Sequence, residues 1–284
     1  LILMGADEAV LETGESYTRI MFGSCFTIVF LFLINAIFRG AGDASLAMRA
    51  LTLANCINIV LDPCLIYGYG PFPELGIEGA AIATNIGRGV GVLYGLYYLC
   101  GGGGKIRLHI ANLVLQMAVI VALLRISIGG VSQFLVSTAS WVFLMQIVSG
   151  FGSAAVAGYT IAVRIVMFSI LPAWGLSNAV ATLVGQNLGA GQPDRAEASV
   201  WYIVKYNAIY MGFASLMILL FTRSIVGLFT DEPAVVEYAV QCLTIFAFAF
   251  VAWGAGMALS QAFNGAGDTM TPTWINVFCF WVVQ

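Results

Sequence analysis

Seven apolar segments, each long enough to cross a lipid bilayer, constrain this chain more than any other feature of its sequence. An eighth begins at residue 271 and is still apolar at 284, and residues 1–6 resemble the end of an earlier one. A membrane-crossing helix needs about 20 mostly apolar residues, whereas a strand of a membrane barrel needs about 10 alternating ones. We therefore expect an all-α, polytopic membrane protein. The seven complete segments are 14–38, 46–68, 78–100, 120–148, 154–184, 201–221 and 234–263.

The composition agrees with a chain that lies in lipid, and it excludes several other classes of protein. Of the 284 residues, 61% are hydrophobic and 9% are charged, whereas a soluble domain carries about 25% charged residues. The net charge of −3 is not that of a nucleic-acid binder. The six cysteines form no CxxC pair and there is one histidine, so we expect no structural metal site. The glycine-rich segment 185–193 has no Lys-Ser or Lys-Thr pair, so we expect no use of ATP.

Basic residues concentrate in alternate connections, and this asymmetry predicts an orientation. Connections rich in Lys and Arg face the cytoplasm, which places the connections after the first, third and fifth segments there. The longest of them starts with the glycines of 101–104. We expect a cytoplasmic linker at 105–119, between a partial N-terminal lobe at 1–104 and a partial C-terminal lobe at 120–284. The basic residues of these connections are Arg39, Arg49, Lys105, Arg107, Arg125, Arg195 and Lys205.

Two stretches of the sequence repeat each other. Phe38-Arg-Gly-Ala-Gly-Asp43 ends the first segment, and Phe263-Asn-Gly-Ala-Gly-Asp268 ends the seventh, with an offset of 225 residues. Upstream, Asp7-Glu8 precedes the first segment as Asp231-Glu232 precedes the seventh. Both copies fall on the same predicted side of the membrane, which indicates two parallel halves related by an axis along the membrane normal. Two bundles of this kind around a central site are typical of alternating-access transporters.

Four motifs together resemble the multidrug and toxic compound extrusion (MATE) family. The resemblance runs from Gly5 to the end of the chain. It implies a parent of twelve helices in two pseudo-symmetric six-helix lobes. On that pattern we expect a fragment that contains helices four to ten, with the end of the third and part of the eleventh, and that lacks the first two helices and the C-terminal end. The motifs are Arg39-Gly-Ala-Gly-Asp43, Asn58-Ile-Val-Leu-Asp-Pro63, Glu78-Gly-Ala-Ala-Ile-Ala-Thr84 and Val184-Gly-Gln-Asn-Leu-Gly-Ala-Gly191.

The segment 46–68 carries the strongest candidate for chemistry. Asn55, Asn58 and Asp62 are spaced three and four apart, so they share one helix face. An ionisable group within hydrocarbon is costly and marks function. At 1.5 Å per residue, Asp62 and Thr84 both lie about 9 Å below the predicted outer boundary. Carboxylate, amide and hydroxyl oxygens at one depth are suitable ligands for a small hard cation.

The MATE resemblance implies a cation site at the same positions. In similar transporters the N-terminal lobe binds a cation through residues that correspond to Asn58, Asp62 and Thr84, together with an aspartate on the first helix. Some relatives carry acids in the second lobe as well. Here the span 120–148 holds Gln133, Ser137, Thr138 and Gln146 but no acid, and the span 234–263 holds Gln261 and, near its start, Glu237. We therefore expect the coupling ion, H⁺ or Na⁺, in the N-terminal lobe, and no other cofactor.

Two arginines also lie inside predicted spans. Arg88 follows Thr84 by four residues on the same face, and Arg164 lies near the middle of its span. For Arg164 we expect a buried ion pair or contacts with backbone carbonyls, because an isolated charge at that depth is costly. The residues that we consider as candidates for a cavity or gate are Asn55, Arg88, Gln133, Arg164 and Gln261.

The sequence thus predicts a secondary active multidrug efflux transporter of the plasma (inner) membrane. It would act as a monomer and export small organic cations and drugs by antiport with H⁺ or Na⁺. Two alternatives stay open. A lipid-linked oligosaccharide flippase of the same superfamily should need a cationic central cavity, and a non-transporting membrane scaffold would need neither the repeat nor the polar cluster. We do not expect an enzyme, because the sequence shows no nucleophile–base pair or metal-ligand set.

Overall fold

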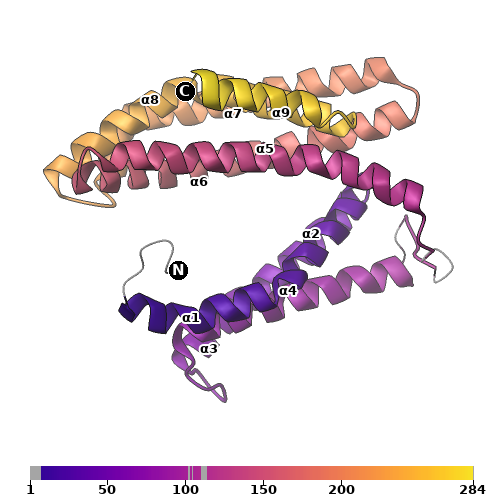
Figure 1. Ribbon diagram of the computed structural model, residues 1–284, viewed down its shortest axis with the longest axis horizontal. Coiled ribbons are helices and arrows are strands. Elements are labelled where there is room, and N and C mark those ends of the chain that lie inside the picture. Colours follow the sequence, from indigo (N-terminus) through magenta and orange to yellow (C-terminus); the bar gives the residue numbers. More distant parts are fainter. Residues whose placement is uncertain (1–7, 102, 104, 110–113, 284) are drawn as a thin grey trace. The chain divides into compact units, whose positions relative to one another are not determined.

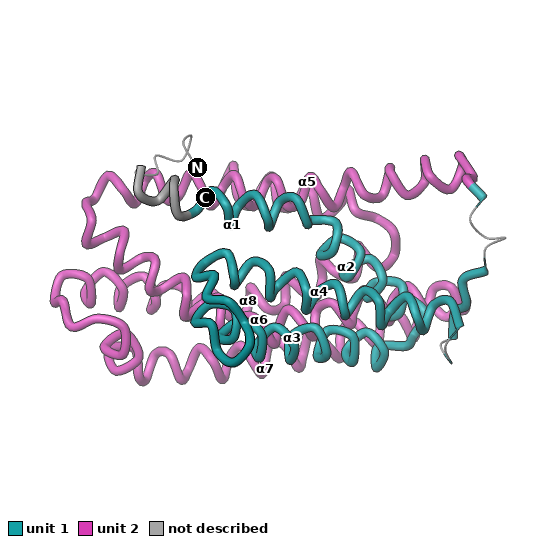
Figure 2. Tube along the Cα trace, turned by 90° about the horizontal axis from the view of Figure 1, so that it is seen from below, with its two compact units in different colours: residues 1–114 teal, residues 115–284 magenta. Residues whose placement is uncertain are grey.

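The computed structural model describes residues 8–101, 103, 105–109 and 114–283, and every regular element within them is a helix (Figure 1). This confirms the all-α prediction. The chain divides into two compact units, 1–114 and 115–284 (Figure 2). Unit 1 contains α1 (Glu8–Gly23), α2 (Cys25–Gly40), α3 (Ala44–Tyr67) and α4 (Gly76–Cys100). Unit 2 contains α5 (Met117–Ser149), α6 (Ser153–Gly189), α7 (Pro193–Val226), α8 (Pro233–Gly265), α9 (Met270–Val277) and the π-helix η3 (Phe278–Val283).

Each predicted span has a helical counterpart, and the chain is a multi-pass membrane protein. Among the described residues, five helices are long and apolar enough to cross a membrane, or six if the bent pair α1–α2 counts as one span. Helix α4 is not among them although it is 25 residues long. Its six glycines, with Asn85 and Arg88, lower its hydropathy. Residues 1–6, which the sequence suggests are the end of an earlier span, lie outside the described residues.

The first predicted span, 14–38, is not one continuous helix, and this part of the prediction is wrong. Helices α1 and α2 meet at Ser24 with a bend of 44°. The Ser24 hydroxyl donates to the carbonyl of Ile20, and a serine that bonds back in this way beside a glycine is a common cause of helix bending. Just after the bend, the Thr27 hydroxyl donates to Asn85 Oδ1 of α4 at 3.1 Å. The bend is therefore tied to the neighbouring helix.

The repeated motif forms the same corner each time. The backbone N–H of Asp43 donates to the carbonyl of Phe38, as that of Asp268 does to Phe263. The glycine before each aspartate has a positive φ, 78° in the first copy and 86° in the second, which favours glycine. The local structure of the repeat is thus confirmed. Segment 187–192 forms a third copy that the sequence comparison missed, with the N–H of Gln192 bonded to the carbonyl of Asn187.

The second corner also begins helix α9. The Thr271 hydroxyl donates to the Asp268 carboxylate at 2.6 Å, and the Thr271 backbone N–H donates to it at 3.1 Å. These two hydrogen bonds lower the pKa of Asp268 below its ordinary value of 3.8, and the bond from the hydroxyl has the larger effect. Asp43 has a corresponding contact, because the Ser45 hydroxyl donates to Asp43 Oδ1 at 3.1 Å.

The predicted linker, 105–119, divides between the two units. Its start returns to unit 1, where Lys105 donates to the carbonyl of Gly42 at 3.0 Å and the N–H of Leu108 donates to that of Leu99 at 2.7 Å. Its end, from Met117, is already the first turn of α5. The intervening residues 110–113 lie outside the described part of the chain.

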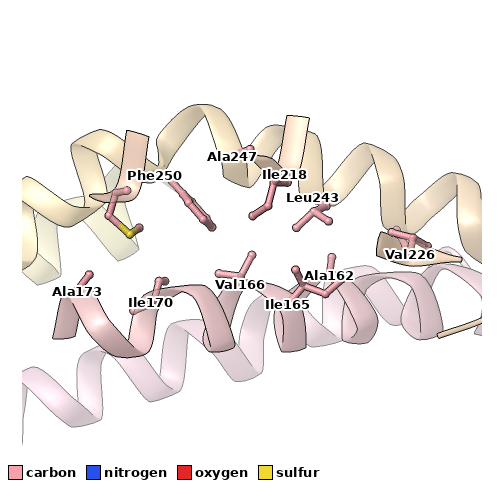
Figure 3. Close-up of a cluster of buried hydrophobic side chains, with 12 residues drawn as sticks. Ala162, Ile165, Val166, Ile170, Ala173, Ile218, Val226, Leu243, Ala247 and Phe250 are labelled. Carbon is pink, nitrogen blue, oxygen red and sulfur yellow. The ribbon is translucent and has the colours of Figure 1, made fainter. Parts of the chain in front are cut away.

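Helices α6, α7 and α8 form the core of unit 2. Their buried cluster combines small residues of α6, such as Ala162 and Ala173, with larger ones of α8, such as Leu243 and Phe250, and all four are fully buried (Figure 3). Alternating small and large side chains let two helices approach closely, which provides packing energy where lipid provides no hydrophobic driving force between helices. Helix α6 continues through Pro172, whereas α7 is kinked at Phe221.

A fully buried asparagine joins these three helices. Asn207 of α7 donates through Nδ2 to Ser177 Oγ at 2.9 Å, to the carbonyl of Gly254 at 3.2 Å and to that of Ala173 at 3.3 Å. Its exposed fraction is 0%. Polar side chains in membrane bundles stabilise helix association through hydrogen bonds of this kind.

We expect Asn207→Leu to lower the free energy of unfolding by about 1–2 kcal/mol, because the replacement loses these hydrogen bonds. Thermal unfolding of the detergent-solubilised protein measures the change. Asn55→Leu is the matched control, since Asn55 is exposed and its side chain makes no hydrogen bond within the described residues. Equal unfolding temperatures for the two variants would show that the buried asparagine contributes nothing specific.

Candidate functional site

The site in unit 1 depends on the close packing of α3 against α4. Small residues recur every fourth position along α4, at Gly79, Ala83, Gly87 and Gly91, and all are buried. A Cβ at Gly79 would lie 2.4 Å from the carbonyl oxygen of Leu65, and one at Gly87 would lie 2.6 Å from that of Ala54. Glycine therefore permits a backbone approach that no other residue allows.

This approach brings the three predicted site residues together. The amide nitrogen of Asn58 donates to Asp62 Oδ1 at 3.0 Å on its own helix and to Thr84 Oγ1 of α4 at 3.2 Å. All three side chains are partly buried. The i, i+4 spacing on α3 places Asn58 and Asp62 on one face, and the antiparallel return of α4 places Thr84 opposite them. We call Asn58, Asp62 and Thr84 the polar cluster.

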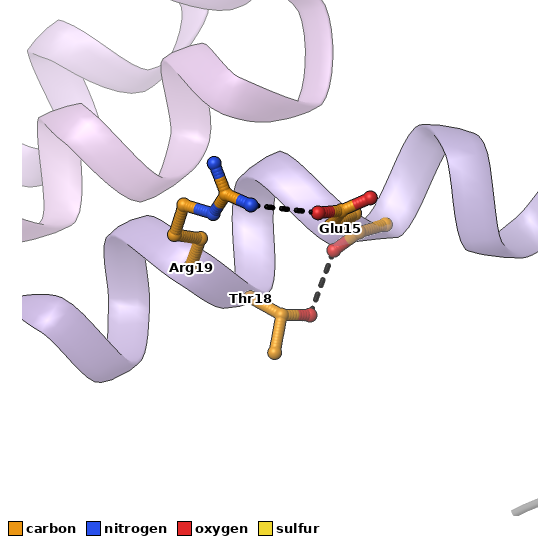
Figure 4. A network of polar contacts seen from close by, with 4 residues as sticks. Glu15, Thr18 and Arg19 are labelled. Atoms are coloured by element: carbon orange, nitrogen blue, oxygen red, sulfur yellow. Dashed lines mark hydrogen bonds and ion pairs between the residues drawn. The ribbon is translucent and has the colours of Figure 1, made fainter. Parts of the chain in front are cut away.

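The polar cluster carries a carboxylate with no cationic partner. An exposed ion pair joins Arg19 to Glu15 on α1, at 2.8 Å (Figure 4), and no ion pair between described residues involves Asp62. No group of three or more His, Cys, Asp and Glu residues gathers anywhere in the described part. An ionised acid within a spanning helix is costly unless a cation or a proton compensates its charge. The cluster is therefore chemically suited to bind one small cation or one proton.

The Asn58 amide contributes its nitrogen to the polar cluster. Its NH₂ group, and not its carbonyl oxygen, faces both Asp62 and Thr84. A metal cation would take the two carboxylate oxygens and the threonine oxygen, and the amide would have to turn over to add its own oxygen. Pro63 has no N–H, which leaves the carbonyl of Ile59 without that helical donor.

Three other predicted residues do not join the polar cluster. Asn55 is exposed, and Arg88 is partly buried. Neither makes a side-chain hydrogen bond or ion pair with another described residue. Arg164 is exposed on α6 and likewise has no such partner in the described part, so the buried pair or carbonyl contacts that we expected for it stay a prediction. Helix α4 instead uses Asn85, which the sequence analysis passed over, to contact Thr27.

The two predicted glutamines of unit 2 lie in one chain of side-chain amides. Gln133 of α5 donates to Asn264 Oδ1 at 3.1 Å, Asn264 donates to Gln261 Oε1 at 3.1 Å, and Gln261 donates to Asn178 Oδ1 of α6 at 3.3 Å. We call these four residues the amide chain. Asn264 and Asn178 were missed. Asn264 occupies the position of Arg39 in the repeat, which was a usable signal.

Comparison with known proteins shows what this arrangement is similar to. The family model MatE matches residues 1–64 and 130–284. The probable multidrug resistance protein YoeA of Bacillus subtilis is 28% identical over 292 residues, which cover 100% of this chain and 62% of that protein. The probable multidrug resistance protein NorM of Thermotoga maritima is 27% identical over 277 residues, which cover 96% of this chain and 59% of that protein.

A solved structure of a MATE family transporter has the same fold as this chain over nearly its whole length. It is described as the outward-facing conformation of a multidrug resistance MATE family transporter of the MOP superfamily, and it superposes with a TM-score of 0.89 at 28% identity. The superposition covers 98% of this chain and 62% of that one. The chain therefore spans less than two thirds of the length of the proteins that it matches. Because the family model matches well over half of its residues, the chain belongs to the MatE family, the multidrug and toxic compound extrusion proteins.

Proposed function

We propose that the protein is a secondary active exporter of drugs and other small xenobiotics, driven by the counterflow of H⁺ or Na⁺ through the polar cluster. The observation that carries the proposal is the lone carboxylate of Asp62 in a spanning helix, bonded to Asn58 and, through it, to Thr84. The printed names of similar proteins, which include a multidrug export protein and a multidrug resistance MATE family transporter, support a transport function over an enzymatic one. Organic cations are the cargo that the sequence resemblance implies.

The mechanism follows from competition between the ion and the cargo. A cation or proton at Asp62 compensates the negative charge and weakens the Asn58–Asp62 hydrogen bond within α3, which frees the Asn58 amide to change its hydrogen bond with Thr84 of α4. We propose that this ion-bound state releases cargo outside and that the ion-free state binds cargo inside. A membrane potential of 100 mV provides about 2.3 kcal/mol for each charge that crosses. At 1.36 kcal/mol for each factor of ten, this corresponds to an approximately fifty-fold concentration ratio.

Reconstitution tests the proposal. The protein in its natural full length is placed in lipid vesicles, and movement of a fluorescent cation such as ethidium is followed under an imposed proton gradient, an imposed sodium gradient, or ATP without a gradient. We expect transport under at least one ion gradient and none with ATP alone. Transport that needs ATP, or that is equally fast with no gradient, would contradict antiport.

A further inference from the structure

A cavity of about 470 Å³ lies within unit 2, whereas the residues of the polar cluster belong to unit 1. Its walls come from α5, α6, α8, α9 and η3, so every lining residue belongs to this unit. The volume falls within the range of about 300–1,000 Å³ typical of small-molecule sites. The cavity is lined on one side by α6 and α8 and on the other by α5, α9 and η3.

The lining of this cavity combines aromatic surface with neutral polar groups. Trp174 of α6 and Trp253 of α8 supply the largest rings, and three members of the amide chain, Gln133, Gln261 and Asn264, supply polar groups. None of the lining residues is Asp, Glu, Lys, Arg or His. Such a lining recognises ligands by shape and hydrogen bonding and offers no formal charge.

Several of these polar groups have hydrogen-bonding capacity left over. Ser177 and Ser137 donate to the carbonyl four residues before them, at 2.8 and 2.9 Å. Ser260 makes no such bond, and Asn276 of α9 has no side-chain hydrogen bond with another described residue. Gln261 donates one of its two amide hydrogens to Asn178, and the other is unassigned. The cavity therefore offers both donors and acceptors to a ligand.

The absence of an acidic side chain decides which ligands this lining favours. The cavity is partly open, so a cation that enters loses part of its hydration, and without a carboxylate its main compensation is the face of Trp174 or Trp253. The attraction of a cation to an aromatic face offsets such a loss less well than an ionised carboxylate does. A planar uncharged ring stacks on the same tryptophans without that loss and satisfies the amides at its edge.

We propose that this cavity binds planar, uncharged aromatic compounds that carry an N–H donor and a carbonyl acceptor on their edge, and that it selects against cations of the same shape. The inference concerns uncharged ligands alone: as a site for such cargo the cavity rests on the proposed export function, and the organic cations whose export that function implies are not assigned to it. Its ligand preference is a property of binding alone, so a failure of transport and a failure of this inference give different results.

Equilibrium binding of two probes built on one ring system tests the inference. Acridone is a neutral tricycle with one N–H and one carbonyl, and proflavine is a planar tricyclic cation. Both are fluorescent, and their anisotropy is measured with the full-length protein in lipid nanodiscs. We expect acridone to bind at least about tenfold more tightly than proflavine. We also expect acridone to slow the reaction of Cys279, which lines the cavity, with a thiol reagent, as followed by peptide mass mapping.

Variants that add one acid to the cavity should reverse this preference. In Ser260→Asp we expect the ratio of the acridone and proflavine affinities to fall by about tenfold or more, whereas the isosteric Ser260→Asn keeps the original order. Gln261→Glu repeats the test at a second position if the first variant does not fold. Equal affinities for acridone and proflavine in the unmodified protein would overturn the inference. So would an affinity ratio that neither Ser260→Asp nor Gln261→Glu changes, or a reaction of Cys279 with the thiol reagent that acridone does not slow.

Discussion

Replacement of Asp62 by asparagine is expected to abolish ion-driven export. Asparagine keeps the shape of the carboxyl group but has no charge to attract a cation and cannot gain or lose a proton, so the polar cluster stays in the equivalent of its neutral state. The concentration ratio that a 100 mV potential supports, approximately fifty-fold for each charge moved, should fall to one. Efflux of a fluorescent drug from energised cells or vesicles measures the ratio directly.

Glu15→Gln is the matched control for Asp62→Asn. Glu15 is also an acid of unit 1, but it is exposed and paired with Arg19 on its own helix. An exposed pair of this kind contributes little energy. We therefore expect its loss to leave efflux unchanged. Undiminished efflux by Asp62→Asn, or an equal loss in both variants, would remove Asp62 from the coupling mechanism.

Gly87→Ala, which adds a single methyl group, is expected to disrupt the polar cluster although it replaces none of the cluster's polar atoms. A Cβ at this position would lie 2.6 Å from the carbonyl oxygen of Ala54 and 3.3 Å from the Cβ of Asn58. Because the nearest atom belongs to the backbone, α3 and α4 must move apart. The Asn58–Thr84 hydrogen bond, already 3.2 Å long, should then break. Overpacking of this kind costs about 1–3 kcal/mol.

Gly89→Ala separates this effect from a general effect of alanine. Gly89 lies on the same helix, and nothing lies within 4 Å of a Cβ built on it. Alanine there should be neutral or should stabilise the helix by up to about 1 kcal/mol. Thermal unfolding and drug efflux are measured for both variants. If Gly87→Ala matches Gly89→Ala in stability and transport, close packing of α3 and α4 does not position the cluster.

Much of the fold could be predicted from the sequence because hydropathy depends on composition over some twenty residues. The spans follow from that average, and the two repeated corners follow from the repeated sequence that ends in Gly-Ala-Gly-Asp. The bend at Ser24 could not be found in this way, since one serine that bonds to the carbonyl of Ile20 hardly changes the average over the span. Helix α7 likewise continues beyond the predicted end at residue 221, because the kink at Phe221 interrupts the backbone geometry without ending the helix.

In the candidate site, too, the sequence pattern predicts some residues, whereas others depend on how the helices pack. Helical spacing placed Asn58 with Asp62, and the antiparallel return of the chain placed Thr84 at a similar depth, so the three residues could be named in advance. Asn264 was missed because its role depends on partners 131 and 3 residues away in sequence, Gln133 and Gln261. The spacing of residues within one helix does not show which side chain of another helix will contact it.

Dependence of drug affinity on the coupling ion tests the central claim most directly. If cargo and ion compete through Asp62, each must weaken the binding of the other by the same factor. For the unmodified protein in nanodiscs, we predict that the Kd for ethidium rises at least about fivefold as either the proton or the sodium concentration is increased. For Asp62→Asn the Kd should be independent of both. An affinity that responds to neither ion in the unmodified protein, or that responds equally in the variant, would contradict the account.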